Sequence, residues 1–449
     1  MARALSLESR VLDRVRPSPE EEHALRDRVD RLLRILRERA RARGLDVEPI
    51  LVGSAAKGTH LKNPDVDLFV LFPAETPREV LEKEGLALGA FLKNRERMFA
   101  EHPYTHGYFE DLEVEVVPCY RISDATQKMS AVDRTPFHAR FVIERITAAQ
   151  RDEVRLLKAF CKGTGTYGAE ARVQGFSGYL CELLVLRFGS FTGVLEAAAG
   201  WRAGTRLGLE TAATREFPEP LAFVDPIDGG RNVASAVSAA TLAVFVHATQ
   251  AYRARPSERF FFPRSRKPLT AAAAARVLRK RGTELLALAL PAPALTEDVL
   301  YPQVHKAARA VADELGRHGF TALGARAERL GREVVLLLEL EVARLPAAEK
   351  HFGPPAWVKN AEDFLAKWRG SRAALSRPFL DGDRWAVLVR REFPDAASLL
   401  RGRAHTLSLG KNLDAATRRA RVLEGRAALK AAWLGEVTEL LDPRFLWER

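Results

Sequence analysis

Cysteine is scarce in this chain of 449 residues, which contains three. Cys119, Cys161 and Cys181 are widely spaced and form no CxxC pair, which excludes a disulfide framework and a cysteine-based zinc site. The sequence also lacks a secretory signal, and no apolar run reaches the roughly 18 to 20 residues that a membrane span requires. These absences predict a soluble cytoplasmic protein without a membrane partner.

Acidic residues are outnumbered as well. The chain has 70 lysines and arginines against 58 aspartates and glutamates, which gives a formal net charge of +12. Such an excess favours polyanionic partners, of which nucleic acid is the commonest, although a solvated arginine-rich surface would give the same total. The hydrophobic share of 47% is ordinary for a globular protein, and the length predicts two to four domains of roughly 100 to 200 residues.

Residues that suit phosphate and metal chemistry concentrate at positions 51–72, which read LVGSAAKGTHLKNPDVDLFVLF. The stretch predicts the end of an apolar strand, a Gly-Ser turn, a short basic helical turn and a second strand that carries Asp65 and Asp67. Residues two apart in a strand share a face, so the two carboxylates would lie side by side, and oxygen-only ligands favour magnesium. The polar face of a half-exposed strand also explains a lone Asp-x-Asp.

The turn before these carboxylates suits a phosphate group. Gly53 allows close approach of the backbone, while exposed N–H groups and the Ser54 hydroxyl can hold phosphate oxygens. Lys57 follows one helical turn later and adds positive charge. A third carboxylate is expected from a neighbouring strand, where Glu113 and Glu115 share one face and alternation does not choose between them. Three carboxylates around two metal ions would serve phosphoryl transfer.

The chain divides by pattern into three parts. The first alternates strands with helices, including a helix expected at 77–102, and predicts a small mixed sheet. Residues 141–253 are mostly helical and are interrupted by a turn-rich loop at 225–232. In the last part, strands such as 260–262 alternate with helices and a hairpin, which predicts one or two α+β units that end in a basic helix at 414–431.

Several blocks resemble one known family. The run GSAAKGTHLKNPDVDLFVLFP is similar to the nucleotidyltransferase signature of the polymerase-beta superfamily, and in particular to archaeal-type (class I) CCA-adding tRNA nucleotidyltransferases. The runs EVEVVPCY, DPIDGGRNVA and GPPAWVKNAEDFLAKW extend the similarity over nearly the whole chain. The resemblance implies an α+β multidomain fold: a mixed-sheet nucleotidyltransferase head at 1–143, a helical central domain completing the nucleotide pocket at 144–256, and α+β tRNA-binding domains at 257–449.

The same resemblance implies a function. The family adds or repairs the 3′-terminal CCA of tRNA without a template, using CTP and ATP. A two-metal magnesium site would be held by Asp65, Asp67 and Glu115. The residues implied to bind or adjoin the nucleotide are Gly53, Ser54, Lys57, Thr135, His138, Lys158, Tyr167, Ser177 and Arg231. The basic C-terminal half would bind the acceptor and TΨC arms of tRNA, and a homodimer is suggested although the sequence carries no interface signature.

Two positions depart from the family pattern. The family usually has Arg where Lys57 stands, so a bidentate phosphate contact is lost while the charge is kept. It usually has Asp where Glu115 stands, and the extra methylene moves the ligating oxygens by roughly an ångström. Two other functions are consistent with the same residues: an RNA nucleotidyltransferase of the poly(A) or oligoadenylate type, and a catalytically silent tRNA-binding protein.

Overall fold

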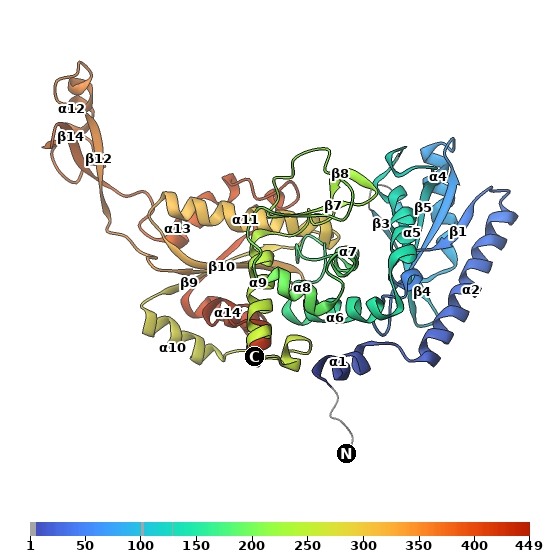
Figure 1. Ribbon diagram of the computed structural model, residues 1–449. Helices are drawn as coiled ribbons and strands as arrows, with labels where there is room; N and C mark the ends of the chain where they lie inside the picture. The colour runs from blue at the N-terminus through green and yellow to red at the C-terminus, as the bar shows by residue number, and fades with distance from the viewer. Residues whose placement is uncertain (1–5, 100–102, 128) are drawn as a thin grey trace. The chain divides into compact units, whose positions relative to one another are not determined.

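The computed structural model describes residues 6–99, 103–127 and 129–449 (Figure 1). Contacts within the chain define two compact units. One contains the described residues up to Ser265 together with Phe445–Arg449, and the other is Arg266–Arg444. Both units combine helices with sheets, so the predicted α+β multidomain fold is confirmed.

The first unit opens with two helices and a five-stranded mixed sheet. The strand order is β1-β2-β5-β4-β3, with β2 and β5 parallel and the other neighbours antiparallel. A short helix joins β1 to β2, at the place where the sequence predicts a Gly-Ser turn and a short helical turn. The elements are α1 (Leu7–Val15), α2 (Pro19–Ala42), β1 (Glu48–Leu51), α3 (Gly53–Lys57), β2 (Val66–Pro73), α4 (Arg78–Leu88), β3 (Lys93–Phe99), β4 (Pro103–Phe109) and β5 (Leu112–Arg121).

Helix α2 packs against one face of this sheet. Leu32 of α2 shares an apolar cluster with Leu68 of β2 and Val114 of β5, and all three side chains are fully buried. Successive residues of a strand point to opposite faces. Asp67 and Glu115, each next to one of these core positions, are therefore directed away from the apolar cluster.

The helix predicted at 77–102 is wrong in its second half. Helix α4 ends at Leu88, and Lys93–Phe99 forms the edge strand β3, while residues 100–102 lie outside the described ranges. The run KNRERM offers no apolar stripe for a helix to bury. At the edge of a sheet the same charged side chains discourage pairing with other strands.

Helices dominate the rest of the first unit, as predicted. They are α5 (Thr135–Arg145), α6 (Ala148–Thr164), α7 (Gly178–Phe188), α8 (Phe191–Ala198) and α9 (Ala239–Ala254). The loop expected at 225–232 is instead mostly a hairpin, because its two arms pair and only Pro226 and Ile227 lie between them. Its strands are β7 (Leu221–Asp225) and β8 (Asp228–Asn232), which join β6 (Thr205–Leu207) in a three-stranded sheet.

The strand predicted at 260–262 is also wrong. Glu258–Phe260 forms a 3₁₀ turn, and the ring of Phe260 stacks 6.0 Å from Phe160 and 5.2 Å from Trp447. Aromatic packing therefore fixes this segment, a tertiary effect that strand propensity does not include.

The second unit contains two antiparallel sheets, ordered β10-β11-β9-β15 and β12-β14-β13. The hairpin predicted here is β10 with β11. The elements are α10 (Ala271–Arg281), β9 (Glu284–Pro291), α11 (Glu297–Arg317), β10 (Ala322–Leu330), β11 (Glu333–Leu340), β12 (Ala348–Pro355), α12 (Ala361–Arg369), β13 (Phe379–Asp381), β14 (Arg384–Arg390), α13 (Ala396–Arg403), β15 (Arg421–Glu424) and α14 (Leu434–Leu441).

The basic helix predicted at 414–431 is wrong. Residues Asp414–Arg419 form a 3₁₀ turn, and Arg421–Glu424 forms β15, which pairs with β9. Val422 lies opposite Leu288 in this pairing, so the segment is held as a strand by hydrogen bonds to β9. Helix propensity alone does not reveal such a partner.

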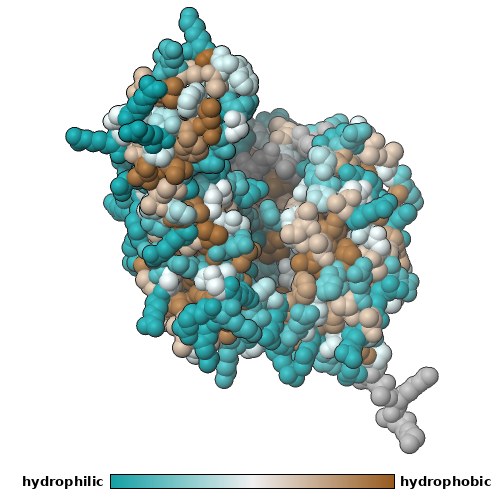
Figure 2. Space-filling view, turned by 90° about the vertical axis from the view of Figure 1, so that its left-hand side faces the viewer, coloured by the Kyte–Doolittle hydropathy of each residue, from teal (hydrophilic) through white to brown (hydrophobic). Residues whose placement is uncertain are grey.

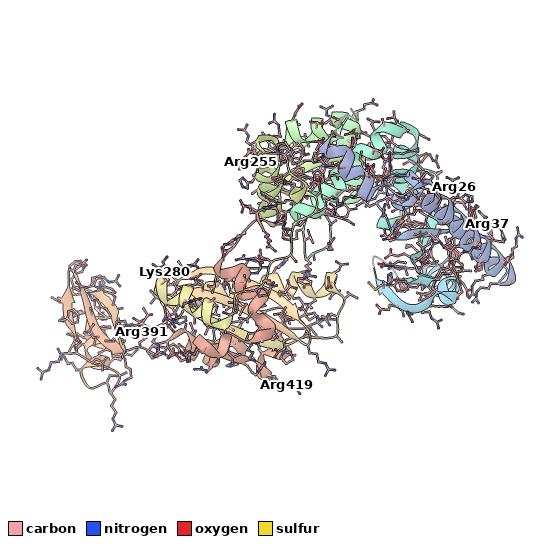
Figure 3. All side chains as sticks on the ribbon, turned by 90° about the horizontal axis from the view of Figure 1, so that it is seen from below. Arg26, Arg37, Arg255, Lys280, Arg391 and Arg419 are labelled. Atoms are coloured by element: carbon pink, nitrogen blue, oxygen red, sulfur yellow. The ribbon has the colours of Figure 1, made fainter. Side chains whose placement is uncertain are left out.

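Hydrophilic side chains predominate on the face shown in Figure 2, with apolar patches among them. Within the described residues, no single helix is long and apolar enough to cross a membrane; α7 and α8 reach that length and composition only as a pair bent by 91°. Exposed basic side chains occur in both units (Figure 3). Examples are Arg26, Arg37 and Arg255 in the first unit and Lys280 and Arg419 in the second.

Some basic side chains of the C-terminal half, which is expected to bind RNA, form ion pairs within the second unit. Arg281 pairs with Glu339 at 2.8 Å, and Arg421 pairs with Glu333. Trp357 is an exposed aromatic side chain of this unit, at 74%. Arg281 and Arg421 are therefore less available to RNA than the basic composition of the C-terminal half suggests.

Candidate active site

Two carboxylates lie next to each other in the head sheet. The parallel pairing of β2 with β5 places Asp67 directly opposite Glu115. Neighbouring strands are about 4.8 Å apart, and residues in register present their side chains on the same face. Both side chains are partly buried. Two negative charges are thus held close together in a poorly solvated position.

The electrostatic cost of this arrangement appears in the pKa values. Burial and then the charge of Asp65 raise the pKa of Asp67 from 3.8 to about 6. Burial and then the charge of Asp67 raise the pKa of Glu115 from 4.5 to about 7. A raised carboxylate pKa means that the ionised form is destabilised. A bound cation would remove this destabilisation.

Gly53 touches one of the two carboxylates. A Cβ built on this glycine would lie 1.8 Å from Oδ2 of Asp67, and the residue has a φ of +68°. Both features require glycine, because a side chain would collide with the carboxylate and would strain the backbone. Ser54 follows in the first turn of α3 and is partly exposed. Gly53, which is expected to let a ligand approach the backbone, therefore also leaves room for the Asp67 carboxylate.

The sheet register distinguishes the two candidates for a third carboxylate. Glu115, not Glu113, lies opposite Asp67, and Glu113 instead lies 2.8 Å from Nε2 of His106. Asp65 is exposed just before β2, and its charge raises the pKa of both Asp67 and Glu115. Among the residues that the structure describes, no three His, Cys, Asp or Glu side chains are already gathered as a metal cluster. The donors are oxygen-only and mutually repulsive, which fits a hard cation.

Lys57 and Lys158, both expected to meet phosphate, are buried and share the carboxylate of Glu182. Nζ of Lys57 lies 2.5 Å from Oε2, and Nζ of Lys158 lies 3.3 Å from Oε1. Thr59 donates its hydroxyl to Oε1 at 2.5 Å. Burial opposes ionisation of Glu182, but the two ammonium groups outweigh it and lower its pKa. Both lysines act to lower the pKa of Asp67, while burial lowers the pKa of Lys158 itself.

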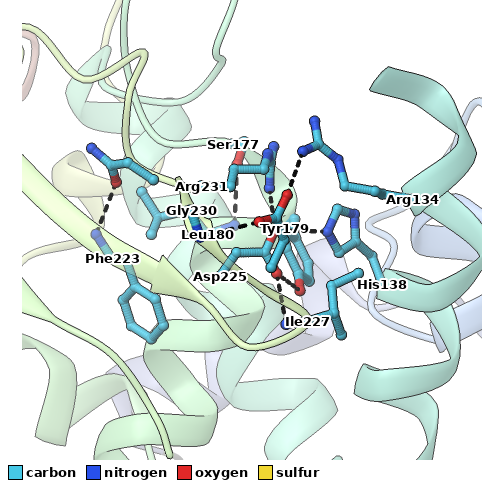
Figure 4. Close-up of polar contacts among 12 residues, drawn as sticks. Arg134, His138, Ser177, Tyr179, Leu180, Phe223, Asp225, Ile227, Gly230 and Arg231 are labelled. Atoms are coloured by element: carbon cyan, nitrogen blue, oxygen red, sulfur yellow. Dashed lines mark hydrogen bonds and ion pairs between the residues drawn. The ribbon is translucent and has the colours of Figure 1, made fainter. Parts of the chain in front are cut away.

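A second polar cluster surrounds Asp225, which is fully buried at the end of β7 (Figure 4). Its Oδ2 accepts hydrogen bonds from Nε2 of His138 at 2.9 Å and from Nη1 of Arg231 at 2.7 Å. The Tyr179 ring lies 4.3 Å from that of His138. Burial opposes ionisation of Asp225, but its contacts with His138 and Arg231 lower its pKa overall. Asp225 thus brings together two predicted nucleotide residues, one from α5 and one from β8.

The other predicted residues lie at helix starts or beside them. Ser177 caps α7, where its hydroxyl accepts from the N–H of Leu180 at 3.1 Å (Figure 4). Thr135 is the first residue of α5. The hydroxyl of Tyr167 lies beside Gly178, because a Cβ built there would be 3.1 Å from it. The Ser177 hydroxyl therefore already uses part of its hydrogen-bonding capacity to cap α7.

Sequence reasoning missed Glu182, Asp225 and His106. Glu182 had a signal, since it is the one acidic residue in the apolar helix GYLCELLVLRF, and a charge in such a helix is rarely buried unpaired. Asp225 lies inside the block DPIDGGRNVA, whose composition predicts only a turn-rich loop. His106 had no sequence signal, because only the sheet register places it opposite Glu115.

The mixed sheet, its paired carboxylates and the glycine turn beside them define this protein as a nucleotidyltransferase. A family model described as a nucleotidyltransferase domain matches residues 29–138. Two further models match: "tRNA nucleotidyltransferase, second domain" at residues 152–262 and "CCA-adding enzyme, C-terminal domain" at 281–425. The domain limits expected after residues 143 and 256 stay predictions.

Three archaeal relatives extend the match over almost the whole chain. The CCA-adding enzyme of Methanoregula boonei is 40% identical over 418 residues, which cover 91% of this chain and 89% of that enzyme. The enzyme of Methanothermobacter thermautotrophicus is 40% identical, covering 92% and 91%. That of Haloarcula marismortui is 39% identical, covering 89% and 90%. The chain belongs to the family of CCA-adding enzymes.

Gly53→Ala should slow nucleotide addition by about 100-fold or more, because the new Cβ displaces the Asp67 carboxylate and small misplacements of reacting groups are that costly. Gly44→Ala is the matched control, since Gly44 has a φ of +66° with no atom within 4 Å of its built Cβ. Both variants should lose roughly 1 kcal/mol of stability from backbone strain. Single-turnover rates check the difference, and equal rates for the two variants would contradict the role of Gly53.

Glu182→Gln should lower the free energy of unfolding by roughly 3 to 5 kcal/mol at pH 7, because it leaves two buried ammonium groups without their carboxylate. The pKa of Glu182 is lower in the folded protein than its ordinary 4.5, so its contribution is complete above pH 4.5. The deficit of the variant should shrink as the pH falls through the folded-state value. Urea unfolding at several pH values measures it, with the exposed Glu196→Gln as a near-neutral control. A pH-independent deficit would exclude this ion cluster as its source.

Proposed function

We propose that this chain builds and repairs the 3′-terminal CCA of tRNA by adding CMP and AMP residues, taken from CTP and ATP, without a template. The 3′ hydroxyl of tRNA attacks the α-phosphorus of the nucleotide, and pyrophosphate leaves. The observation that carries the proposal is the register of Asp67 with Glu115 beside Gly53, in a chain that belongs to the family of CCA-adding enzymes.

Asp65, Asp67 and Glu115 would hold the divalent metal, which we propose to be Mg²⁺ at a two-metal site. Their oxygen-only donors and the raised pKa values of Asp67 and Glu115 support this assignment. When bound, the metal lowers the pKa of the attacking hydroxyl and neutralises charge on the triphosphate. Glu115 would supply the third ligand despite its extra methylene.

Lys57 and Lys158 would act on the triphosphate as a buried positive charge. Because Glu182 neutralises only one of the two ammonium groups, the pair leaves one positive charge near Asp67. This charge attracts the nucleotide without the forked contact that an arginine would offer. The backbone at Gly53 and the Ser54 hydroxyl would complete the phosphate contact.

Arg231 and His138 would contact the nucleotide from the Asp225 cluster. Asp225 holds one Nη group of Arg231 and leaves the rest of its guanidinium, 32% exposed as a side chain, to meet a base or phosphate. His138 donates through Nε2 to Asp225, and burial lowers the pKa of its imidazole, so Nδ1 is an acceptor that would meet a hydroxyl or amino donor of the nucleotide. Neighbouring groups of the same pocket would be Thr135, Tyr167 and Ser177.

The exposed basic residues would bind tRNA through its phosphates, with the second unit on the acceptor and TΨC arms. Exposed Lys280, Arg419 and Trp357 support this assignment. The three buried free cysteines are typical of a reducing compartment and support a cytoplasmic location. Assembly as a homodimer stays an expectation from the family resemblance.

Purified protein given tRNA that lacks CCA should require both CTP and ATP and should stop after three additions. Asp67→Asn should reduce addition by roughly 100-fold or more because it removes a metal ligand and half of the paired charge. Gel analysis of labelled products measures both effects. Unlimited addition of A to any RNA would contradict the proposal and favour a poly(A)-type enzyme.

The affinity for tRNA provides the control in the same experiment. Asp67→Asn should bind tRNA about as tightly as the wild type, and binding of both proteins should weaken steeply with salt. Asp27→Asn, an exposed position on α2, should retain full activity. A wild-type protein that binds tRNA tightly but adds no nucleotide would instead identify a silent tRNA-binding protein.

A further inference from the structure

A pocket of about 570 Å³ lies between α2, α3 and the start of α6. It shares only Lys57 with the residues assigned above to the active site. Its volume falls within the range of about 300 to 1,000 Å³ that is usual for small-molecule sites. Apart from Lys57, its lining residues have no role in the reaction proposed above.

The pocket is lined by five lysine and arginine side chains against three carboxylates. Arg155 is fully engaged, since it donates to the carbonyls of His60 and Gly58 at 2.9 and 2.8 Å and pairs with Asp152 at 2.7 Å. In contrast, Arg26 and Arg151 form no side-chain hydrogen bond or ion pair within the described residues. The positive charge available to a ligand therefore resides on these two arginines.

Buried polar atoms of the pocket also lack partners. Neither ring nitrogen of His60 has a hydrogen-bond partner of good geometry among the described residues, although the Ser54 backbone lies near the ring, and the residue is only 6% exposed. Nε of Arg151 is buried and unpartnered in the same way. The guanidinium carbon of Arg151 would lie 3.6 Å from a Cβ built on Gly58, so this arginine packs against the end of α3. Buried donors without partners are rare and indicate a missing ligand or water.

Part of the pocket wall is apolar. Leu25 and Val29 of α2 line it, together with the partly buried Leu33 and Leu51. Asp30 also lines the pocket, one helical turn from Arg26 on α2, and has no ion pair in the described part of the chain. A lining that combines apolar and cationic side chains suits a molecule with an organic body and an anionic group.

We propose that this pocket is a second ligand site, which binds a phosphate-bearing organic molecule of mononucleotide size. Arg26 and Arg151 contact the phosphate, the ring of His60 supplies a further hydrogen bond, and the organic body lies against Leu25 and Val29. Bidentate guanidinium contacts are the usual means of holding phosphate. Because α3 forms part of the wall and carries Gly53 at its other end, the ligand binds next to the element that supports Asp67.

AMP binding to the full chain in EDTA, measured by titration calorimetry, tests the proposal. Arg26→Gln and Arg151→Gln should each weaken AMP binding by about tenfold or more, because each removes a charged contact to phosphate. Arg37→Gln is the matched control, since Arg37 is also exposed on α2 but does not line the pocket (Figure 3). Arg231→Gln should leave this AMP site intact, which separates it from the nucleotide pocket of the proposed reaction. Because Arg26 is exposed, its variant provides the test even if Arg151→Gln fails to fold.

Several results would overturn the proposal. AMP binding that survives both Arg26→Gln and Arg151→Gln would exclude the pocket, and AMP binding lost only in Arg231→Gln would place the nucleotide in the active site alone. Inorganic phosphate that binds as tightly as AMP would show that the apolar wall contributes nothing. A loss of tRNA affinity in Arg26→Gln, with AMP binding unchanged, would assign these arginines to RNA instead.

Discussion

The burial of Asp67 and Glu115 side by side is the constraint on which this active site depends. The sheet register forces the two carboxylates together, burial deprives them of water, and the pKa of each is raised by about two units or more. Such a pair is unfavourable at neutral pH unless positive charge compensates it. The fold supplies part of that charge in advance, and a bound cation would supply the rest.

Two buried carboxylates organise the compensating cations. Glu182 gathers Lys57 from α3 and Lys158 from α6, and Asp225 gathers His138 from α5 and an arginine from β8. Each carboxylate neutralises part of the charge around it and fixes the direction of the groups that remain. Glu182 and Asp225, which were not among the predicted site residues, therefore each hold two residues that were.

The sequence predicted the carboxylates of the head better than the residues that surround them. The spacing of Asp65 and Asp67 after a Gly-Ser turn is a local pattern, but β2 begins at Val66, so only Asp67 lies on the strand and alternation does not fix the direction of Asp65. The choice of Glu115 over Glu113 needed the register of β2 with β5, which is a long-range property. The same limitation explains why Glu182 and Asp225 were missed, since their partners are distant in sequence.

Errors in secondary structure had a similar origin. Residues 93–99 and 421–424 were assigned to helices but form strands, because each finds a pairing partner that local propensity does not specify. Phe260 was assigned to a strand but packs within an aromatic cluster. The family resemblance, by contrast, depended on whole blocks of residues and was confirmed by relatives across the chain.

The most direct measurement of the central claim is the affinity for Mn²⁺, titrated at fixed CTP concentration and pH 8, for the wild type, Glu115→Gln and Glu113→Gln. The account predicts that Glu115→Gln weakens Mn²⁺ binding by roughly tenfold or more, whereas Glu113→Gln, whose carboxylate lies beside His106, binds like the wild type. Weakened binding in Glu113→Gln with normal binding in Glu115→Gln would contradict it.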